Sequence, residues 1–184
     1  SVRALPEEVA TPDGEGWWLP LRPSTLCDPT TTAFLGIRQA HVDVDVRAMM
    51  RATLADGEEV GLVVRQSEQD HVRLAVRPSD DDGEVRVAVI HRQGGQERTL
   101  GDAVLRRAED EPIDLLLSAD GQEYALHAGV TGGPMQRIGV ADGRTLDAVS
   151  TGGFLGLWVG VYGTSSGAET TTVLHIDRFS YDPR

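Results

Sequence analysis

The sequence predicts an all-β protein, specifically a two-sheet antiparallel β-sandwich. Roughly ten short segments with alternating or β-branched apolar residues recur at spacings of roughly 8 to 14 residues. Turn-forming residues such as Asp-Gly separate them, and no window shows a convincing helical repeat. Many short strands with little helix favour two packed sheets.

The first half of the chain contains four predicted strands. The clearest is residues 41–54, where apolar residues alternate with polar ones, including Asp43 and Asp45, so that one face is expected to meet solvent. Residues 59–65, 71–77 and 84–90 follow as a meander, separated by Asp, Gly, Pro and Ser.

The second half adds a hairpin and two closing strands. Residues 113–118 and 123–127 flank Asp120-Gly121, which favours a tight turn, and strands are expected at 154–162 and 170–181. Residues 101–109 are the one stretch that could form a helical turn. The glycine-rich segment 129–153 is expected to be ordered loop, with at most a short strand at 136–140.

Composition limits the possible partners. With 29 acidic against 17 basic residues among 184, the net charge of −12 argues against nucleic acid and anionic membranes as partners. The chain has no lysine or asparagine, which excludes a P-loop lysine and N-glycosylation, and Cys27 alone cannot form an internal disulfide. We expect a soluble protein, cytoplasmic rather than secreted.

The organisation expected is residues 1–16 as a linker from a longer parent chain and residues 17–184 as one β-sandwich domain. The chain starts at Ser1 without an initiator Met, and a loop-like stretch precedes the first periodic segment.

Carboxylates and histidines give no convincing catalytic or metal site. Asp43 and Asp45 are interpreted as a solvated strand face, and Asp80 to Asp82 as a hairpin tip rather than a Ca²⁺ site. The five histidines lack metal-ligand spacing, and Cys27 is interpreted as an ordinary thiol.

Two groups of side chains are of more interest. Arg38, Gln39 and His41 stand at the entrance to an apolar strand and need hydrogen-bond partners, either from another domain or from an internal network. Aromatic rings can bind sugar faces: of Trp17 and Trp18, one should point to the core and the other away. The set Phe154, Trp158 and Tyr162 fits either a sugar platform or an inner sandwich layer.

Several segments, from about Trp17 to Tyr181, resemble the C-terminal domain of glycoside hydrolase family 43 β-xylosidases. Ile37 departs from the pattern, since relatives usually carry a second arginine there. The segments that carry the resemblance are Leu21-Arg-Pro-Ser, Ala33-Phe-Leu-Gly-Ile-Arg38-Gln39-Ala-His41, Gly57-Glu-Glu-Val-Gly-Leu-Val-Val-Arg-Gln66, His71-Val-Arg-Leu, Gly152-Gly-Phe154-Leu-Gly-Leu-Trp-Val-Gly-Val-Tyr162 and Ile176-Asp-Arg-Phe179-Ser-Tyr181.

The resemblance implies a concanavalin A-like sandwich appended to a catalytic β-propeller of the same parent chain, which these residues do not contain. It implies a non-catalytic accessory domain of a β-xylosidase or α-L-arabinofuranosidase, which contacts xylo-oligosaccharide or arabinosyl substrate only through the propeller and needs no cofactor or metal. Phe154 best matches an aromatic residue that reaches the propeller's pocket. The alternative is an autonomous carbohydrate-binding module.

Overall fold

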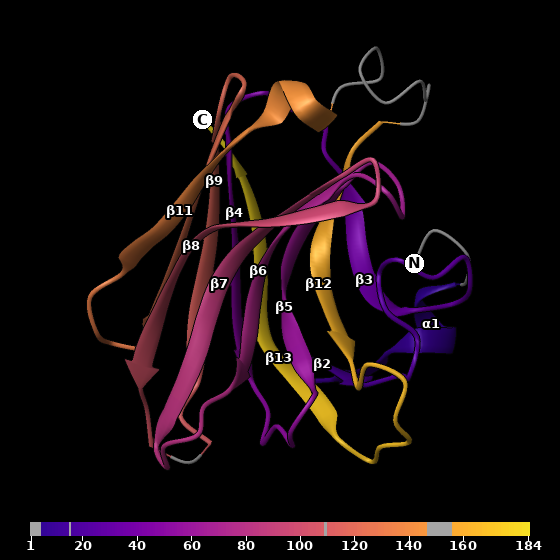
Figure 1. The fold of residues 1–184 in the computed structure, drawn as a ribbon, viewed down its shortest axis with the longest axis vertical. Helices are drawn as coiled ribbons and strands as arrows, with labels where there is room; N and C mark the ends of the chain where they lie inside the picture. The colour runs from indigo at the N-terminus through magenta and orange to yellow at the C-terminus, as the bar shows by residue number, and fades with distance from the viewer. Residues whose placement is uncertain (1–4, 15, 109, 147–155) are drawn as a thin grey trace.

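The structure is a computed structural model that describes residues 5–14, 16–108, 110–146 and 156–184 as two antiparallel sheets packed face to face (Figure 1). One sheet has seven strands in the order β1-β2-β13-β4-β9-β10-β11, and the other has six in the order β3-β12-β5-β6-β7-β8, which confirms the predicted sandwich. The elements are α1 Pro6–Val9, β1 Thr11–Asp13, β2 Gly16–Pro20, β3 Ala33–Arg38, β4 Val44–Arg51, β5 Glu59–Arg65, β6 His71–Pro78, β7 Glu84–Gln93, β8 Gln96–Arg106, β9 Ile113–Asp120, β10 Glu123–Val130, β11 Gln136–Asp142, η1 Gly143–Leu146, β12 Trp158–Thr164 and β13 Val173–Pro183.

Most predicted strands lie where the alternation placed them, and the Asp120-Gly121 hairpin joins β9 to β10. The helical turn considered for residues 101–109 is wrong, because residues 101–106 belong to β8, which pairs along its length with β7. Cross-strand hydrogen bonds override weak local preference here. The short strand at 136–140 is confirmed and extends to Asp142 as β11.

The N-terminal residues contribute to the sheet. Val9 and Ala10 are buried in the main core, and β1 pairs with β2. The assignment of residues 1–16 to a linker of a longer chain stays a prediction. Within the described residues, no helix has the length and apolar character needed to cross a membrane.

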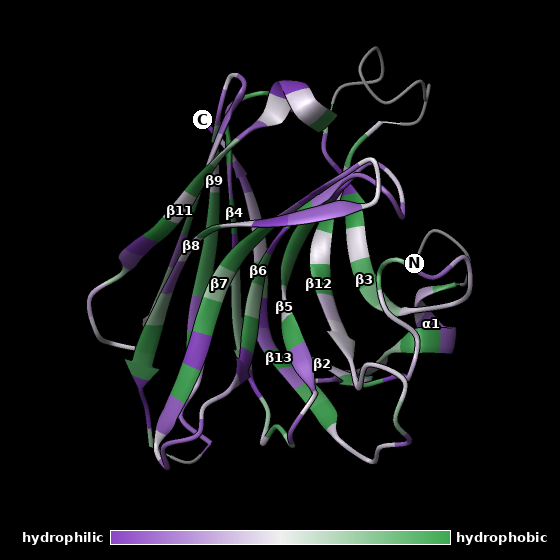
Figure 2. Cartoon of the chain, in the orientation of Figure 1, coloured by the Kyte–Doolittle hydropathy of each residue, from purple (hydrophilic) through white to green (hydrophobic). Residues whose placement is uncertain are grey.

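The main core fills the space between the sheets, and the alternating hydrophobic residues are visible along the strands in Figure 2. Leu115 and Leu117 of β9 belong to this core together with Leu62 of β5 and Leu74 of β6, and all four are at most 1% exposed. Each buried leucine contributes about 1.5 to 3 kcal/mol of transfer free energy, so this layer dominates the stability.

The middle of the six-stranded sheet is also covered on its outer face, because every residue of β5 is buried. Leu26, from the connection between β2 and β3, packs there against Phe34, Val63 and Tyr162. The turn between β7 and β8 is hydrogen-bonded to the turn between β5 and β6, because the Gly95 N–H donates to the Gln69 carbonyl at 3.1 Å. The outward-facing side chains of β5 are therefore held in a protein interior.

Strands β3 and β12 approach too closely for a side chain at Gly160. A Cβ atom there would overlap the backbone of Leu35 and Gly36. We expect Gly160→Ala to lower the unfolding free energy by about 1 to 3 kcal/mol, because rigid backbone must move. Gly156→Ala is the control, since its Cβ would meet only the flexible end of Arg38. Urea denaturation of both variants measures the difference, and equal stabilities would contradict the prediction.

Candidate functional site

The polar residues after β3 form a network at one end of the sandwich. The Gln39 Oε1 atom accepts a hydrogen bond from the Tyr124 hydroxyl at 2.9 Å, and its Nε2 donates to the His41 carbonyl at 3.0 Å. The backbone N–H groups of Ala40 and His41 donate to the Tyr181 hydroxyl at 2.8 and 3.0 Å. Burial raises the pKa of Tyr124. These bonds tie the end of β3 to β10 and β13 of the other sheet.

Arg38 is arranged differently from Gln39 and His41. Its guanidinium lies 5.0 Å from the ring centroid of Trp158, close enough for a cation–π interaction. Ile37, which precedes Arg38, is 41% exposed, and Val42, four residues after it, is 65% exposed. The Trp158 indole N–H is buried and has no acceptor among the described residues. The end of β3 thus presents exposed apolar and cationic groups, which we call the β3 edge: Ile37, Arg38 and Val42.

The two described aromatic residues of the predicted set, Trp158 and Tyr162, occupy neither position expected for it. Tyr162 is 1% exposed and packs on the outer face of the six-stranded sheet with Phe34 and Val63, and Trp158 packs against the same cluster. It is therefore neither a free sugar platform nor part of the layer between the sheets. Phe154 lies outside the described residues.

A buried ionic network lies beside Tyr162, and sequence reasoning missed it. The Glu59 Oε1 atom accepts hydrogen bonds from the Tyr162 hydroxyl at 2.7 Å and from Arg73 Nε at 3.0 Å. Arg77 Nε donates to Oε2 at 2.7 Å. Arg73 also binds Glu97 in a bidentate pair at 2.8 and 3.1 Å, which lowers the pKa of Glu97. This network satisfies charges that would otherwise be costly to bury.

Cys27, His71 and Glu97 offer metal-binding atoms within 4.8 Å of one another. They come from three distant segments, so no sequence spacing could reveal them. Arg73 Nη1, however, lies 3.4 Å from His71 Nε2 and 2.8 Å from Glu97 Oε1. A guanidinium already supplies the positive charge between two of the three groups, which makes a cation unfavourable there.

The carboxylates considered earlier are engaged in structural hydrogen bonds or are exposed. Asp43 accepts from the Gly121 N–H at 2.8 Å, and Asp45 accepts from the Ser118 hydroxyl at 2.6 Å. Asp80 to Asp82 are exposed in the turn between β6 and β7, as the hairpin-tip interpretation predicts.

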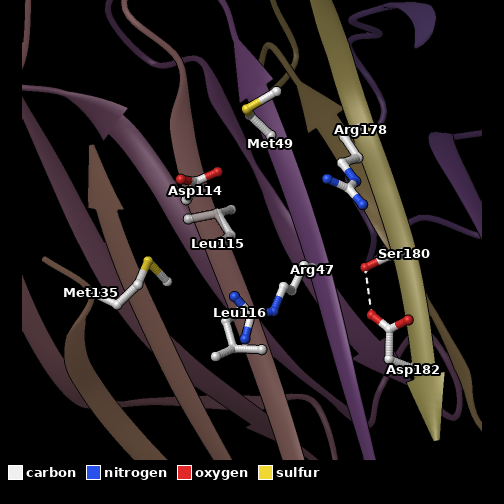
Figure 3. A pocket seen from close by; sticks show the side chains of 9 residues that line it. All are labelled: Arg47, Met49, Asp114, Leu115, Leu116, Met135, Arg178, Ser180 and Asp182. Atoms are coloured by element: carbon white, nitrogen blue, oxygen red, sulfur yellow. Dashed lines mark hydrogen bonds between the residues drawn. The ribbon is translucent and has the colours of Figure 1, made fainter. Parts of the chain in front are cut away.

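Two hollows lie on the outside of the seven-stranded sheet. The first, about 480 Å³, is lined by Arg47, Arg178, Asp114, Asp182 and residues such as Met49, Met135 and Leu116, and no aromatic ring is among its described lining residues (Figure 3). The second, about 420 Å³, lies beside Trp18, which is 44% exposed while Trp17 packs against the core. The expected opposite orientations of the two tryptophans are confirmed.

A two-sheet antiparallel sandwich defines an architecture that serves many functions, so the family must come from comparison. A family model described as the β-xylosidase C-terminal concanavalin A-like domain matches residues 10–182. The chain therefore belongs to this family of glycoside hydrolase family 43 domains.

Related proteins are considerably longer than this chain. The non-reducing end α-L-arabinofuranosidase BoGH43B of Bacteroides ovatus is 27% identical over 154 residues, which cover 81% of this chain and 27% of that protein. A BlXynB mutant of Bacillus licheniformis superposes with a TM-score of 0.87 at 19% identity, covering all of this chain and 36% of that one. A xylan β-1,4-xylosidase of Bacillus halodurans superposes with a TM-score of 0.81 at 20% identity. The match covers 91% of this chain and 32% of that one. The two solved structures support the fold.

The neutral His71 makes stability depend on pH. Burial first, and then the charges of Arg73 and Arg65, lower the pKa of His71 from 6.5 to about 3. Below pH 6.5 the unfolded chain binds this proton and the folded chain does not. The unfolding free energy therefore falls by about 1.4 kcal/mol per pH unit as pH drops toward 3.

We expect His71→Gln to remove most of that slope, as measured by urea denaturation between about pH 4 and 6. Above about pH 7 the two proteins should show parallel pH dependence, which serves as the internal control. An equal slope in both proteins at acid pH would show that His71 is not held neutral.

Proposed function

We propose that this chain is a non-catalytic accessory domain of a glycoside hydrolase, a β-xylosidase or α-L-arabinofuranosidase acting on xylan-derived oligosaccharides. It packs on a catalytic β-propeller of the same parent chain and helps to shape the substrate pocket. The observation that carries the proposal is the β3 edge, where Ile37 precedes the stacked Arg38 and Val42 follows it by four residues, 41% and 65% exposed. An autonomous carbohydrate-binding module has no need of such an edge.

The chemistry of the described residues supports a non-catalytic role. Glycoside hydrolysis needs two carboxyl groups roughly 5 to 10 Å apart on either side of the scissile bond, open to substrate. Glu59 is only 7% exposed and accepts hydrogen bonds from Tyr162, Arg73 and Arg77. Asp43 and Asp45 bind backbone and side-chain donors of their own sheet. None of these groups is placed to work on a sugar.

The proposal predicts association between this chain and the catalytic part of its parent enzyme. We expect the chain alone to give no turnover of aryl xylosides or arabinosides, and to bind the separately expressed catalytic part when the two are mixed. Val42→Asp should weaken that binding at least about tenfold, because a charge would be buried without a partner.

Val104→Asp is the matched control, since Val104 is 47% exposed on β8, away from the β3 edge. Analytical ultracentrifugation or calorimetry measures the association. Turnover by the chain alone that is lost on mutation of one carboxylate, or equal binding by both variants, would refute the accessory role.

Phe154 is proposed to enter the substrate pocket of the parent enzyme. A ring that closes over the sugar would exclude water and strengthen interactions with the transition state. In the parent enzyme, Phe154→Ala should leave the melting temperature nearly unchanged and shift kcat or KM. A core residue would instead lose about 3 to 5 kcal/mol of stability with unchanged kinetics of the folded enzyme, which would contradict the proposal.

A further inference from the structure

Strand β8 is an edge strand of the six-stranded sheet, with a partner strand on one side only. It pairs with β7 and stands last in the order of the sheet, at the opposite edge from β3 (Figure 1). An edge strand presents a row of backbone N–H and C=O groups to which another strand can pair. The Ile138 carbonyl of β11 lies against Gly101, so a partner strand is expected along residues 102–106, beyond this crossing.

Side chains alternate regularly along residues 102–106. Ala103 and Leu105 pack against the main core between the sheets. Asp102, Val104 and Arg106 are exposed on the outer face of the sheet. Val104 is 47% exposed, and the Arg106 side chain is 90% exposed. An apolar residue thus stands in solvent between two residues of opposite charge, at an edge to which no described strand pairs.

The backbone groups of these three exposed residues point away from β7. The Arg107 N–H donates to the Gly83 carbonyl at 2.9 Å, at the end of the ladder between β7 and β8. In an antiparallel ladder, residues whose N–H and C=O groups face the neighbouring strand alternate with residues whose groups face away. The register has no shift over residues 102–106. The inward-facing Ala103 and Leu105 therefore bond to β7, and the exposed residues direct their groups to the open edge.

The same segment of a second copy of the chain complements this edge when it runs antiparallel. If Val104 lies opposite Val104 of the second copy, Asp102 lies opposite Arg106 of that copy, and Arg106 lies opposite its Asp102. Directly opposite side chains on one face have Cβ atoms about 4.5 to 5.5 Å apart, so both charged pairs attract. A shift of the register by two residues would instead place Val104 opposite a charged side chain. The order of the three side chains therefore selects one register.

The charge pattern continues into the sheet. Glu84 of β7 is the residue directly opposite Arg106, and its Oε1 atom lies 2.9 Å from Arg106 Nε. With Asp102 of a second copy on the other side of Arg106, acidic and basic side chains alternate across three strands. A guanidinium has five N–H donors, which is enough for both carboxylates.

We propose that β8 joins two copies of this chain into a symmetric dimer by antiparallel pairing of residues 102–106, with Val104 at the two-fold axis. The two six-stranded sheets then form one continuous sheet, and the same patch serves on both subunits, as in any isologous interface. Because β3 lies at the far edge of the same sheet, the β3 edge stays open in the dimer. The inference therefore does not depend on the proposed function.

The interface is small, so the dimer is weak. Pairing along residues 102–106 supplies about six backbone hydrogen bonds, the two charged pairs and the contact between the valines. This is less than a stable interface of roughly 800 Å² per partner provides, and we expect a dissociation constant of about 20 to 500 µM. Each chain has a net charge of −12, and salt at about 0.15 M screens this repulsion beyond about 8 Å.

Sedimentation velocity of the chain at about 5 to 500 µM in this salt measures the self-association. Asp102→Arg or Arg106→Asp alone should weaken it at least about tenfold, because each variant places like charges opposite one another. A mixture of the two variants should form a heterodimer about as tightly as the parent chain associates, since each charged pair again joins an acid to a base. This rescue distinguishes the proposed register from any other contact between copies.

Val104→Asp should also weaken self-association at least about tenfold, because it places two carboxylates at the two-fold axis. Val42→Asp, on the β3 edge, is the matched control and should leave it unchanged, and thermal melts show whether each variant is folded. The proposal is overturned if the parent chain stays monomeric up to about 500 µM, if either charge variant associates as the parent does, or if the mixture stays monomeric. Association with the catalytic part is measured separately, and Val104→Asp should leave it unchanged. Failure of the dimer is therefore distinguishable from failure of the accessory role.

Discussion

The central constraint of this structure is that the middle of the six-stranded sheet, at β5 and most of β6, is buried on both faces. All of β5 is buried, so its outward-facing residues cannot be solvated and must find partners within the protein. Glu59 is the clearest case, because its carboxylate receives hydrogen bonds from Tyr162, Arg73 and Arg77. The charges on the outer face are acceptable only because they occur as a connected set.

The same constraint explains the glycines of this sheet. The Tyr162 ring lies over Gly61, and the Phe34 ring lies over Gly36, where a Cβ atom would meet the ring carbons at 3.1 and 2.6 Å. Glycine therefore makes room for the aromatic cluster that covers the sheet from outside. The need to pair buried charges also explains why Cys27, His71 and Glu97 do not form a cation site. Arg73 lies beside His71 and neutralises Glu97.

Period-two alternation was sufficient to predict the sandwich and the position of most strands, because the layer between the sheets dictates which residues face inward. It could not show that the other face of β6 is buried, since His71, Arg73 and Arg77 have the composition of a solvent-exposed face. Glu97 of β8 pairs with Arg73, and Cys27 offers its sulfur within 4.8 Å of a His71 ring nitrogen; both residues are remote from β6 in sequence. Residues 101–106 were misjudged for a related reason: their partner β7, rather than local preference, decides their conformation.

The polar network at the end of β3 gives the proposed docking edge a fixed geometry. At the end of β3, Gln39 and His41 are bonded to Tyr124 and Tyr181, which fixes the backbone that presents Ile37, Arg38 and Val42. Apolar groups beside a stacked guanidinium suit a protein surface, where desolvation over a wide area supplies affinity.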